Sequence, residues 1–366
     1  MMKLGIVGLP NVGKSTLFNA ITGSAVDAAN YPFCTIDPNV GTVSVPDTRL
    51  DFLNELYKPK RLIPAAIEFV DIAGLVKGAS KGEGLGNQFL SHIRQTHALV
   101  HVVRCFDDSD IIHVEGTSDP ERDIGILELE LALSDIEIIG RQIERAKKNA
   151  KGGGKAYLRE AEILQDLQNH LNSGGLVRTF VQPPDVASSI SQLDLLSAKP
   201  VIYAANLDEA SFSEGFAENP YYRQVQTISA KAGALTLPIS AKVEEEIIQL
   251  SPEYQAVFLE ELGLTQSGLD RLIQCSYDLL GLISFFTVVG EEVRAWTIAR
   301  GTSAYAAAGK IHSDFQRGFI RAEVIPFDEL KAIGDMAKAK AKGQVRSEGK
   351  DYEVQDGDVI QFRFNV

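Results

Sequence analysis

One loop near the amino terminus constrains the fold of this chain more than any other feature. Residues 8–15 read GLPNVGKS and match the phosphate-binding pattern G-x-x-x-x-G-K-[ST]. The loop lies between an apolar run at residues 4–7, which predicts a strand, and a helical pattern over residues 15–22. Its glycines let backbone N–H groups turn toward phosphate oxygens, and the helix amino terminus adds a favourable dipole. The alternative is a glycine turn that carries an exposed lysine.

The side chains of this loop have separate expected roles. Lys14 is predicted to reach the β- and γ-phosphates of a nucleotide and so to act in catalysis, and the Ser15 hydroxyl is predicted to bind Mg²⁺. The predicted phosphate-binding residues are Asn11, Val12, Gly13, Lys14, Ser15 and Thr16.

A second phosphate contact is predicted directly after the strand pattern at residues 65–70. Asp71 can hold the magnesium shell, and Gly74 can offer its N–H to the γ-phosphate as a second catalytic group. Thr35, between the two motifs, is the third predicted magnesium ligand. The glycine-rich stretch that follows, residues 78–86, predicts a switch loop that the γ-phosphate orders, or simply a flexible surface loop.

The apolar runs predict an α/β fold. Further strands are expected at residues 98–105 and 200–205, interleaved with helices, so the sheet should be mostly parallel with helices on both faces. Ligands of such sheets bind at the carboxyl ends of the strands. Two long helical patterns flank three glycines at residues 152–154 and predict an antiparallel helical hairpin, inserted at about residues 120–198. An arm of about 28 residues would reach about 40 Å.

The last part of the chain is expected to be a separate domain. Strands are predicted at residues 285–289, 293–299 and within 351–364, with one helix over residues 304–315. We therefore place a boundary near residue 280, with a nucleotide-binding domain at 1–279 and a second domain at 280–366.

Charge and composition narrow the cellular compartment and the kinds of partner that we expect for this chain. The chain has no apolar run of membrane-spanning length and no signal-peptide pattern, and its three cysteines lack metal spacing, so we expect a cytoplasmic protein without a membrane partner. A net charge of −13 argues against indiscriminate nucleic-acid binding. The hairpin tip nevertheless carries seven basic residues against one acid, which predicts either an RNA contact or a solvated helix face. The basic residues are Arg141, Arg145, Lys147, Lys148, Lys151, Lys155 and Arg159.

Several segments, taken in order, resemble one family. Residues 8–16, 71–76, 82–86, 312–321 and 348–358 are similar to the Obg-related branch of P-loop translation-factor GTPases, and within it to members that hydrolyse ATP. The resemblance implies an ATPase switch that acts on ribosomes, with a helical insertion and a C-terminal β-grasp domain of the TGS type. It also implies a monomer that contacts the large subunit or the 70S ribosome, and rRNA, through the helical arm and the TGS domain.

The base preference is read after the strand at residues 200–205. GTPases carry N-K-x-D there, whereas this chain has NLDE, with Leu207 in place of the lysine and Glu209 in place of the aspartate. Losing both residues weakens a guanine site, although Asp208 could serve in a shifted register, and the resemblance favours ATP. A second S-A-K triplet at residues 229–231 competes with the one at 240–242. The predicted base pocket comprises Asn206, Leu207, Glu209, Ser240 and Ala241.

The sequence lacks the usual residue that activates the attacking water. Leu75 stands where Ras-like enzymes have a glutamine, and no arginine finger is evident, so slow turnover raised by a partner is expected. A monovalent cation such as K⁺ near Asn11 could help to position the phosphates. His113 is the best side-chain candidate for the catalytic role, against the alternative that it is structural. Nearby Asp107 and Asp108 lack the spacing of a calcium site and are expected to be solvated.

Three other functions fit parts of the pattern. A GTPase of the same fold is the nearest. A metabolic kinase would need an acceptor pocket and a catalytic base, which the sequence does not reveal. A nucleotide-gated scaffold for RNA or ribosomes, with incidental hydrolysis, is the third.

Overall fold

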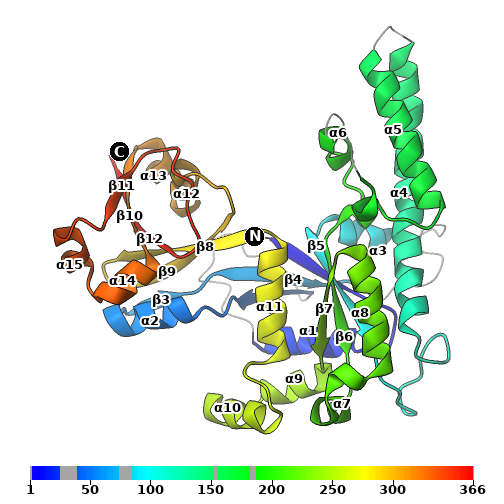
Figure 1. Cartoon of the computed structure of the whole chain (residues 1–366), viewed down its shortest axis with the longest axis horizontal. Coiled ribbons are helices and arrows are strands. Elements are labelled where there is room, and N and C mark those ends of the chain that lie inside the picture. The colour runs from blue at the N-terminus through cyan, green and yellow to red at the C-terminus, as the bar shows by residue number, and fades with distance from the viewer. Residues whose placement is uncertain (1, 25–38, 74–84, 152–154, 182–186, 366) are drawn as a thin grey trace.

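The computed structural model describes residues 2–24, 39–73, 85–151, 155–181 and 187–365. Over these residues the chain forms two six-stranded sheets, in the orders β2-β4-β1-β5-β6-β7 and β11-β10-β12-β8-β9-β3. Figure 1 shows the two sheets in separate parts of the molecule, with a pair of long helices projecting from the first part.

The first sheet is the predicted mostly parallel one. All its neighbouring strands run parallel except β2, which pairs antiparallel with β4. The sequence analysis missed β2 and β7, and both are edge strands. β7 includes Pro238, which a sheet tolerates at an edge but which weakens a strand pattern. The strands are β1 (Lys3–Val7), β2 (Val40–Ser44), β4 (Ala66–Asp71), β5 (Ala98–Arg104), β6 (Val201–Asn206) and β7 (Leu235–Ile239).

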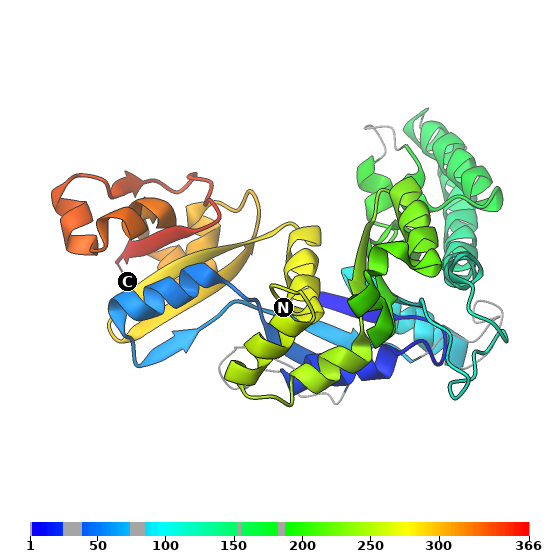
Figure 2. The same cartoon turned by 60° about the horizontal axis from the view of Figure 1, so that its bottom comes forward.

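Helices pack on both faces of this sheet (Figures 1 and 2). The short apolar strands are buried almost completely, and Ile6, Phe69 and Tyr203 are fully enclosed in one core. The helices of this part are α1 (Lys14–Gly23), α3 (Leu85–Arg94), α7 (Glu209–Glu214), α8 (Pro220–Ala232), α9 (Ala241–Ile247), α10 (Pro252–Glu261) and α11 (Gly268–Leu279), with the short η4 (Phe216–Glu218).

The predicted helical hairpin is present. α4 (Pro120–Ala150) and α5 (Lys155–Asn172) pack along a shared row of buried aliphatic side chains. Asp119 caps α4 by accepting a hydrogen bond from the Arg122 N–H, at 3.2 Å, and Pro120 starts the helix. A helix of 31 residues is about 46 Å long, and Figure 1 shows the pair standing away from the body. The chain returns through η2 (Val177–Thr179), α6 (Ala187–Ser191) and η3 (Leu196–Ala198).

The second sheet is built mainly from the last part of the chain. The predicted helix at residues 304–315 is interrupted at His312, whose backbone is extended and whose ring accepts a hydrogen bond from the Asp314 N–H. Within residues 351–364 only one strand forms, and its two partners lie earlier in the chain, β10 antiparallel to it and β8 parallel. The elements are β8 (Leu282–Val289), β9 (Glu292–Ala299), α12 (Ala304–Ile311), α13 (Ser313–Arg317), β10 (Phe319–Pro326), α14 (Phe327–Ile333), α15 (Met336–Ala341), β11 (Arg346–Glu348) and β12 (Asp358–Phe364).

One early segment joins this second sheet. β3 (Arg61–Ile63) pairs in parallel with β9, and α2 (Thr48–Tyr57) packs beside it through Phe52, whose ring lies 5.5 Å from that of Phe327. The pairing of this early segment with the second sheet was not predicted, because a strand of three residues is too short to show a recognisable apolar pattern. The division of the chain at residue 280 stays a prediction.

Candidate nucleotide-binding site

The loop after β1 has the geometry that its glycines predict. Gly13 has φ of 93°, and a Cβ there would lie 2.1 Å from the Asn206 Nδ2 atom. A Cβ on Gly8 would lie 2.7 Å from the Val102 carbonyl oxygen. Only glycine therefore fits at these two positions, because a side chain would collide with the neighbouring strand ends. The Gly13 carbonyl accepts the first helical hydrogen bond, from Leu17, so the loop leads directly into α1.

The predicted lysine and aspartate meet. The Lys14 Nζ lies 3.4 Å from the Asp71 Oδ1, and Lys14 is almost buried. Strand pairing explains the meeting, because Ile6 of β1 is in register with Asp71 at the end of β4. Ser15, at the start of α1, is exposed. The two other residues predicted for this end, Thr35 and Gly74, lie outside the described residues.

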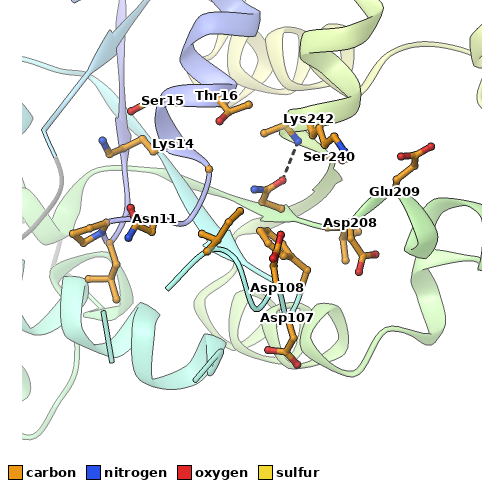
Figure 3. Close-up of a pocket in the computed structure, with 18 of the residues that line it drawn as sticks. Asn11, Lys14, Ser15, Thr16, Asp107, Asp108, Asp208, Glu209, Ser240 and Lys242 are labelled. Atoms are coloured by element: carbon orange, nitrogen blue, oxygen red, sulfur yellow. Dashed lines mark hydrogen bonds between the residues drawn. The ribbon is translucent and has the colours of Figure 1, made fainter. Parts of the chain in front are cut away.

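A cavity of about 760 Å³ opens over this loop (Figure 3). In that view Lys14 and Ser15 lie at one end, and Asp208 and Glu209 lie at the other. Of the predicted nucleotide-binding residues Val12 does not line the cavity; it is buried and belongs to the core cluster. The predicted residues that line it are Asn11, Gly13, Lys14, Ser15, Thr16, Asn206, Leu207, Glu209, Ser240 and Ala241.

Asn206 connects the two ends of the cavity. Its Nδ2 donates to the Val12 carbonyl at 2.9 Å, and its Oδ1 accepts from the Ala241 N–H at 2.9 Å. The side chain sits at the end of β6 and is buried. Because both polar atoms are used within the protein, Asn206 braces the phosphate loop against the loop at 240–241.

The other candidate residues at the base end differ in their contacts and positions. The Asp208 carboxylate caps α7 by accepting from the Ser211 N–H at 2.9 Å, so it has a structural task beside the cavity. Glu209, in the first turn of α7, is exposed. The competing triplet at residues 229–231 lies within α8 and does not line the cavity, whereas Ser240, Ala241 and Lys242 do.

One wall of the cavity, the loop after β5, was not predicted from the sequence. Asp107 and Asp108, expected to be merely solvated, line the cavity together with Phe106 and Ile111. The Asp107 carboxylate accepts a hydrogen bond from the Tyr221 hydroxyl at 2.7 Å, which lowers the pKa of Asp107. No periodicity marks such a loop; its position after a parallel strand was the signal that could have found it. The lining residues that were not predicted are Leu9, Pro10, Phe106, Asp107, Asp108, Ile111 and Ala210, whereas Asp208 and the triplet that contains Lys242 had been considered.

His113 has structural partners in this arrangement. Its Nδ1 accepts from the Glu115 N–H at 3.1 Å, and its Nε2 lies 2.8 Å from the Asp123 Oδ2 in a buried pair. With both ring nitrogens bonded, the imidazole has no lone pair to offer to water. The neighbouring Ile112 carbonyl accepts from the Asn11 Nδ2 at 3.0 Å, so the loop that carries His113 touches the phosphate loop. A catalytic role would require this loop to rearrange, and the role stays a prediction.

Comparison with known proteins places the chain in a family. A model of the YchF GTPase C-terminal region, described as a protein of unknown function, matches residues 282–365. A second model, described as a 50S ribosome-binding GTPase, matches residues 3–138. The "Ribosome-binding ATPase YchF" of Bacillus subtilis strain 168 is 53% identical over 362 residues, which cover 99% of both chains. The chain belongs to the YchF family.

Other YchF proteins agree with this assignment over the whole length. The "Ribosome-binding ATPase YchF" of Escherichia coli O157:H7 is 51% identical over 364 residues, 100% of this chain and 99% of the relative. The solved YchF GTPase of Schizosaccharomyces pombe is 39% identical, with a TM-score of 0.89 over 99% of this chain and 97% of its own. The predicted α/β fold with a P-loop domain is thereby confirmed. Across the described part of this YchF chain, no helix is long and apolar enough to cross a membrane.

Proposed function

We propose that this chain is a magnesium-dependent ATPase that binds ribosomes and changes state as ATP is hydrolysed. One observation carries the proposal. The cavity is bounded at one end by the phosphate loop, with the Lys14 ammonium beside Asp71, and at the other by a base site that lacks the guanine signature. The relatives named ribosome-binding ATPases support both halves of it.

Preference for ATP over GTP follows from the base end. Guanine recognition needs a carboxylate that accepts two N–H bonds and a lysine stem over the ring, and this chain offers Leu207 and Glu209 at those positions. The buried Leu207 presents an apolar surface, which suits a purine ring and takes no hydrogen bond. Glu209 is one methylene longer than aspartate and exposed, so it is poorly placed to pair with guanine.

The oxygen donors at the phosphate end fit Mg²⁺. Ser15 exposes its hydroxyl at the start of α1, and Asp71 presents a carboxylate nearby, and Mg²⁺ favours one or two such oxygens together with substrate phosphates. Among the described residues, no group of three or more His, Cys, Asp or Glu is placed so that it could hold a metal ion by itself. When bound, Mg²⁺ would neutralise phosphate charge. Thr35 is proposed as a further ligand, and a K⁺ ion near Asn11 as a second cation.

Lys14 and the backbone N–H groups of its loop carry the chemistry that the chain itself supplies. They hold the β- and γ-phosphates and stabilise the charge that develops as the terminal phosphoryl group leaves. Gly74 is proposed to donate its N–H to the γ-phosphate, and His113 to position the attacking water after its loop rearranges. Intrinsic turnover is expected to be slow.

The ribosome contact is proposed to lie on the helical arm and the C-terminal domain. All seven basic residues of the hairpin tip, Arg141 to Arg159, are exposed, in a chain of net charge −13. A positive cluster at the end of a long arm suits the phosphates of rRNA, on the large subunit or the 70S particle. The C-terminal domain, proposed to be of the TGS type, would add a second contact. We propose a cytoplasmic monomer.

Two experiments test the proposal: competition binding tests the base preference, and co-sedimentation tests the ribosome contact. A labelled ADP bound to the free protein should be displaced by ATP at a lower concentration than by GTP. Salt-dependent ribosome co-sedimentation should weaken when Lys147, Lys148 and Lys151 are changed to glutamine, with nucleotide affinity unchanged. Equal displacement by GTP, or unaltered co-sedimentation, would contradict the corresponding half of the proposal.

A further inference from the structure

A buried arginine shapes the missed wall of the cavity. Arg104 is the last residue of β5 and only 2% exposed. Its guanidinium donates to three backbone carbonyls of the loop that follows: Nε to Phe106 at 3.1 Å, Nη1 to Ile111 at 2.9 Å and Nη2 to Asp108 at 3.2 Å. The loop is therefore wrapped around one side chain.

The same guanidinium also fixes an aromatic ring. Its central carbon lies 4.6 Å from the centre of the Phe106 ring, a cation–π contact. Phe106, Asp108 and Ile111 all line the nucleotide cavity, and Figure 3 shows Asp107 and Asp108 on the side opposite Ser240 and Lys242. Each of the three carbonyls that Arg104 holds thus belongs to a residue that lines this cavity.

We propose that Arg104 is a positioning residue for nucleotide recognition: its guanidinium folds residues 106–111 into the wall of the cavity that faces the nucleoside. The inference rests on the proposed nucleotide site. Arg104 acts through Phe106, Asp108 and Ile111, so its removal should displace the part of the cavity wall that these residues form.

A lysine could not take over this task. The guanidinium is a planar fork with several donors in fixed directions, and an ammonium is a point charge that cannot span three carbonyls and stack on a ring at once. Loss of the fork leaves three carbonyls without their donor, so the loop must open toward water. The cavity then widens at its nucleoside side, while Lys14 and Asp71 keep their contact at the other end.

Steady-state kinetics with ATP and with GTP test the proposal. In Arg104→Gln we expect the KM for ATP to rise about tenfold, kcat to change much less, and the preference for ATP over GTP to fall. Phe106→Leu, which removes the ring but buries no new polar group, should shift the same quantities in the same direction by a smaller factor. Arg104→Lys should resemble Arg104→Gln.

The matched control is Arg178→Gln. Arg178 is another largely buried guanidinium, which pairs with Glu128 and Tyr203 away from the cavity. The Arg178→Gln variant should have a lower Tm and an unchanged preference for ATP over GTP. A folded Arg104→Gln protein with wild-type KM and wild-type ratio would overturn the proposal, as would an unchanged Phe106→Leu if Arg104→Gln fails to fold. Absence of magnesium-dependent ATP binding by the wild-type chain would instead refute the proposed function.

Discussion

The two ends of the nucleotide cavity are built in different ways. The phosphate end comes from one continuous loop, residues 8–16, whose Lys14 lies beside Asp71 of a neighbouring strand. The base end comes from three loops, after β5, β6 and β7, whose lining residues are spread over residues 106–242 of the chain. The first end depends on local backbone geometry, and the second depends on side chains that tie distant loops together. A single change should therefore damage the two ends differently.

The largest effect is expected at the residue that joins the two ends. Asn206→Ala leaves the Val12 carbonyl and the Ala241 N–H without partners in a buried place, so the free energy of unfolding should fall by about 3 kcal/mol. Nucleotide affinity should fall at the same time. Urea unfolding and ATP titration check both. Asn206→Asp can still accept from the Ala241 N–H, but it places a buried carboxylate oxygen against the Val12 carbonyl, so it should be at least as damaging. Wild-type stability and wild-type ATP affinity in either variant would contradict the brace.

His113 tests whether the connecting loop takes part in catalysis. If the loop rearranges as proposed, His113→Ala should lower kcat about a hundredfold with little change in KM, because a water-positioning group is lost. Asp123→Asn keeps the imidazole and weakens the bond that holds it, so it should retain most of kcat. Single-turnover hydrolysis distinguishes the two. A similar loss in both variants, matched by a lower Tm, would assign His113 a purely structural role.

The nucleotide preference of the base end should be convertible from ATP to GTP. The double change Leu207→Lys and Glu209→Asp restores the residues of the guanine signature, and we expect the ratio of ATP to GTP affinity to shift about tenfold or more toward GTP. The phosphate end should be untouched, so affinity for inorganic triphosphate should stay constant. Competition binding measures both, and an unchanged ratio would show that other residues select the base.

The last expected effect concerns stability and depends on pH. Glu244 of α9 is buried and accepts hydrogen bonds from the Gly268 and Leu269 N–H groups, and burial raises its pKa to about 7. The folded state therefore holds this proton more tightly than the unfolded state, so the stabilisation is complete below the unfolded pKa and is lost as pH rises toward 7. Unfolding free energy should fall by up to about 2–3 kcal/mol between pH 4.5 and 7. In Glu244→Gln the decline should be smaller, and an identical profile would contradict the assignment.

The difference between the ends also explains what the sequence could predict. Lys14, Ser15 and Asp71 were found because the phosphate loop is a contiguous motif next to strands with clear apolar runs. The role of Asn206 as a brace and the wall at Phe106 depend on contacts between residues far apart in the chain, which no local pattern records.

The same limit applies to the fold. β1, β4, β5 and β6 lie in the centre of the first sheet and are apolar enough to be recognised. β2, β3, β7 and β11 lie at sheet edges and were not predicted. β10, inside the second sheet, was not predicted either, because the charged Arg321 and Glu323 interrupt its apolar run. The interruption at His312 depends on a side chain that accepts a hydrogen bond from the backbone N–H of Asp314, which the helical pattern of residues 304–315 does not reveal.

The most direct test is magnesium-dependent ATP binding and hydrolysis by the wild-type chain and by Lys14→Ala. The account predicts that the wild type binds ATP with Mg²⁺ and releases phosphate slowly, and that Lys14→Ala loses at least about a hundredfold in kcat/KM with the fold retained, because the ammonium that meets the phosphates is gone. Hydrolysis by Lys14→Ala at the wild-type rate, or a wild-type chain that ignores ATP, would contradict it.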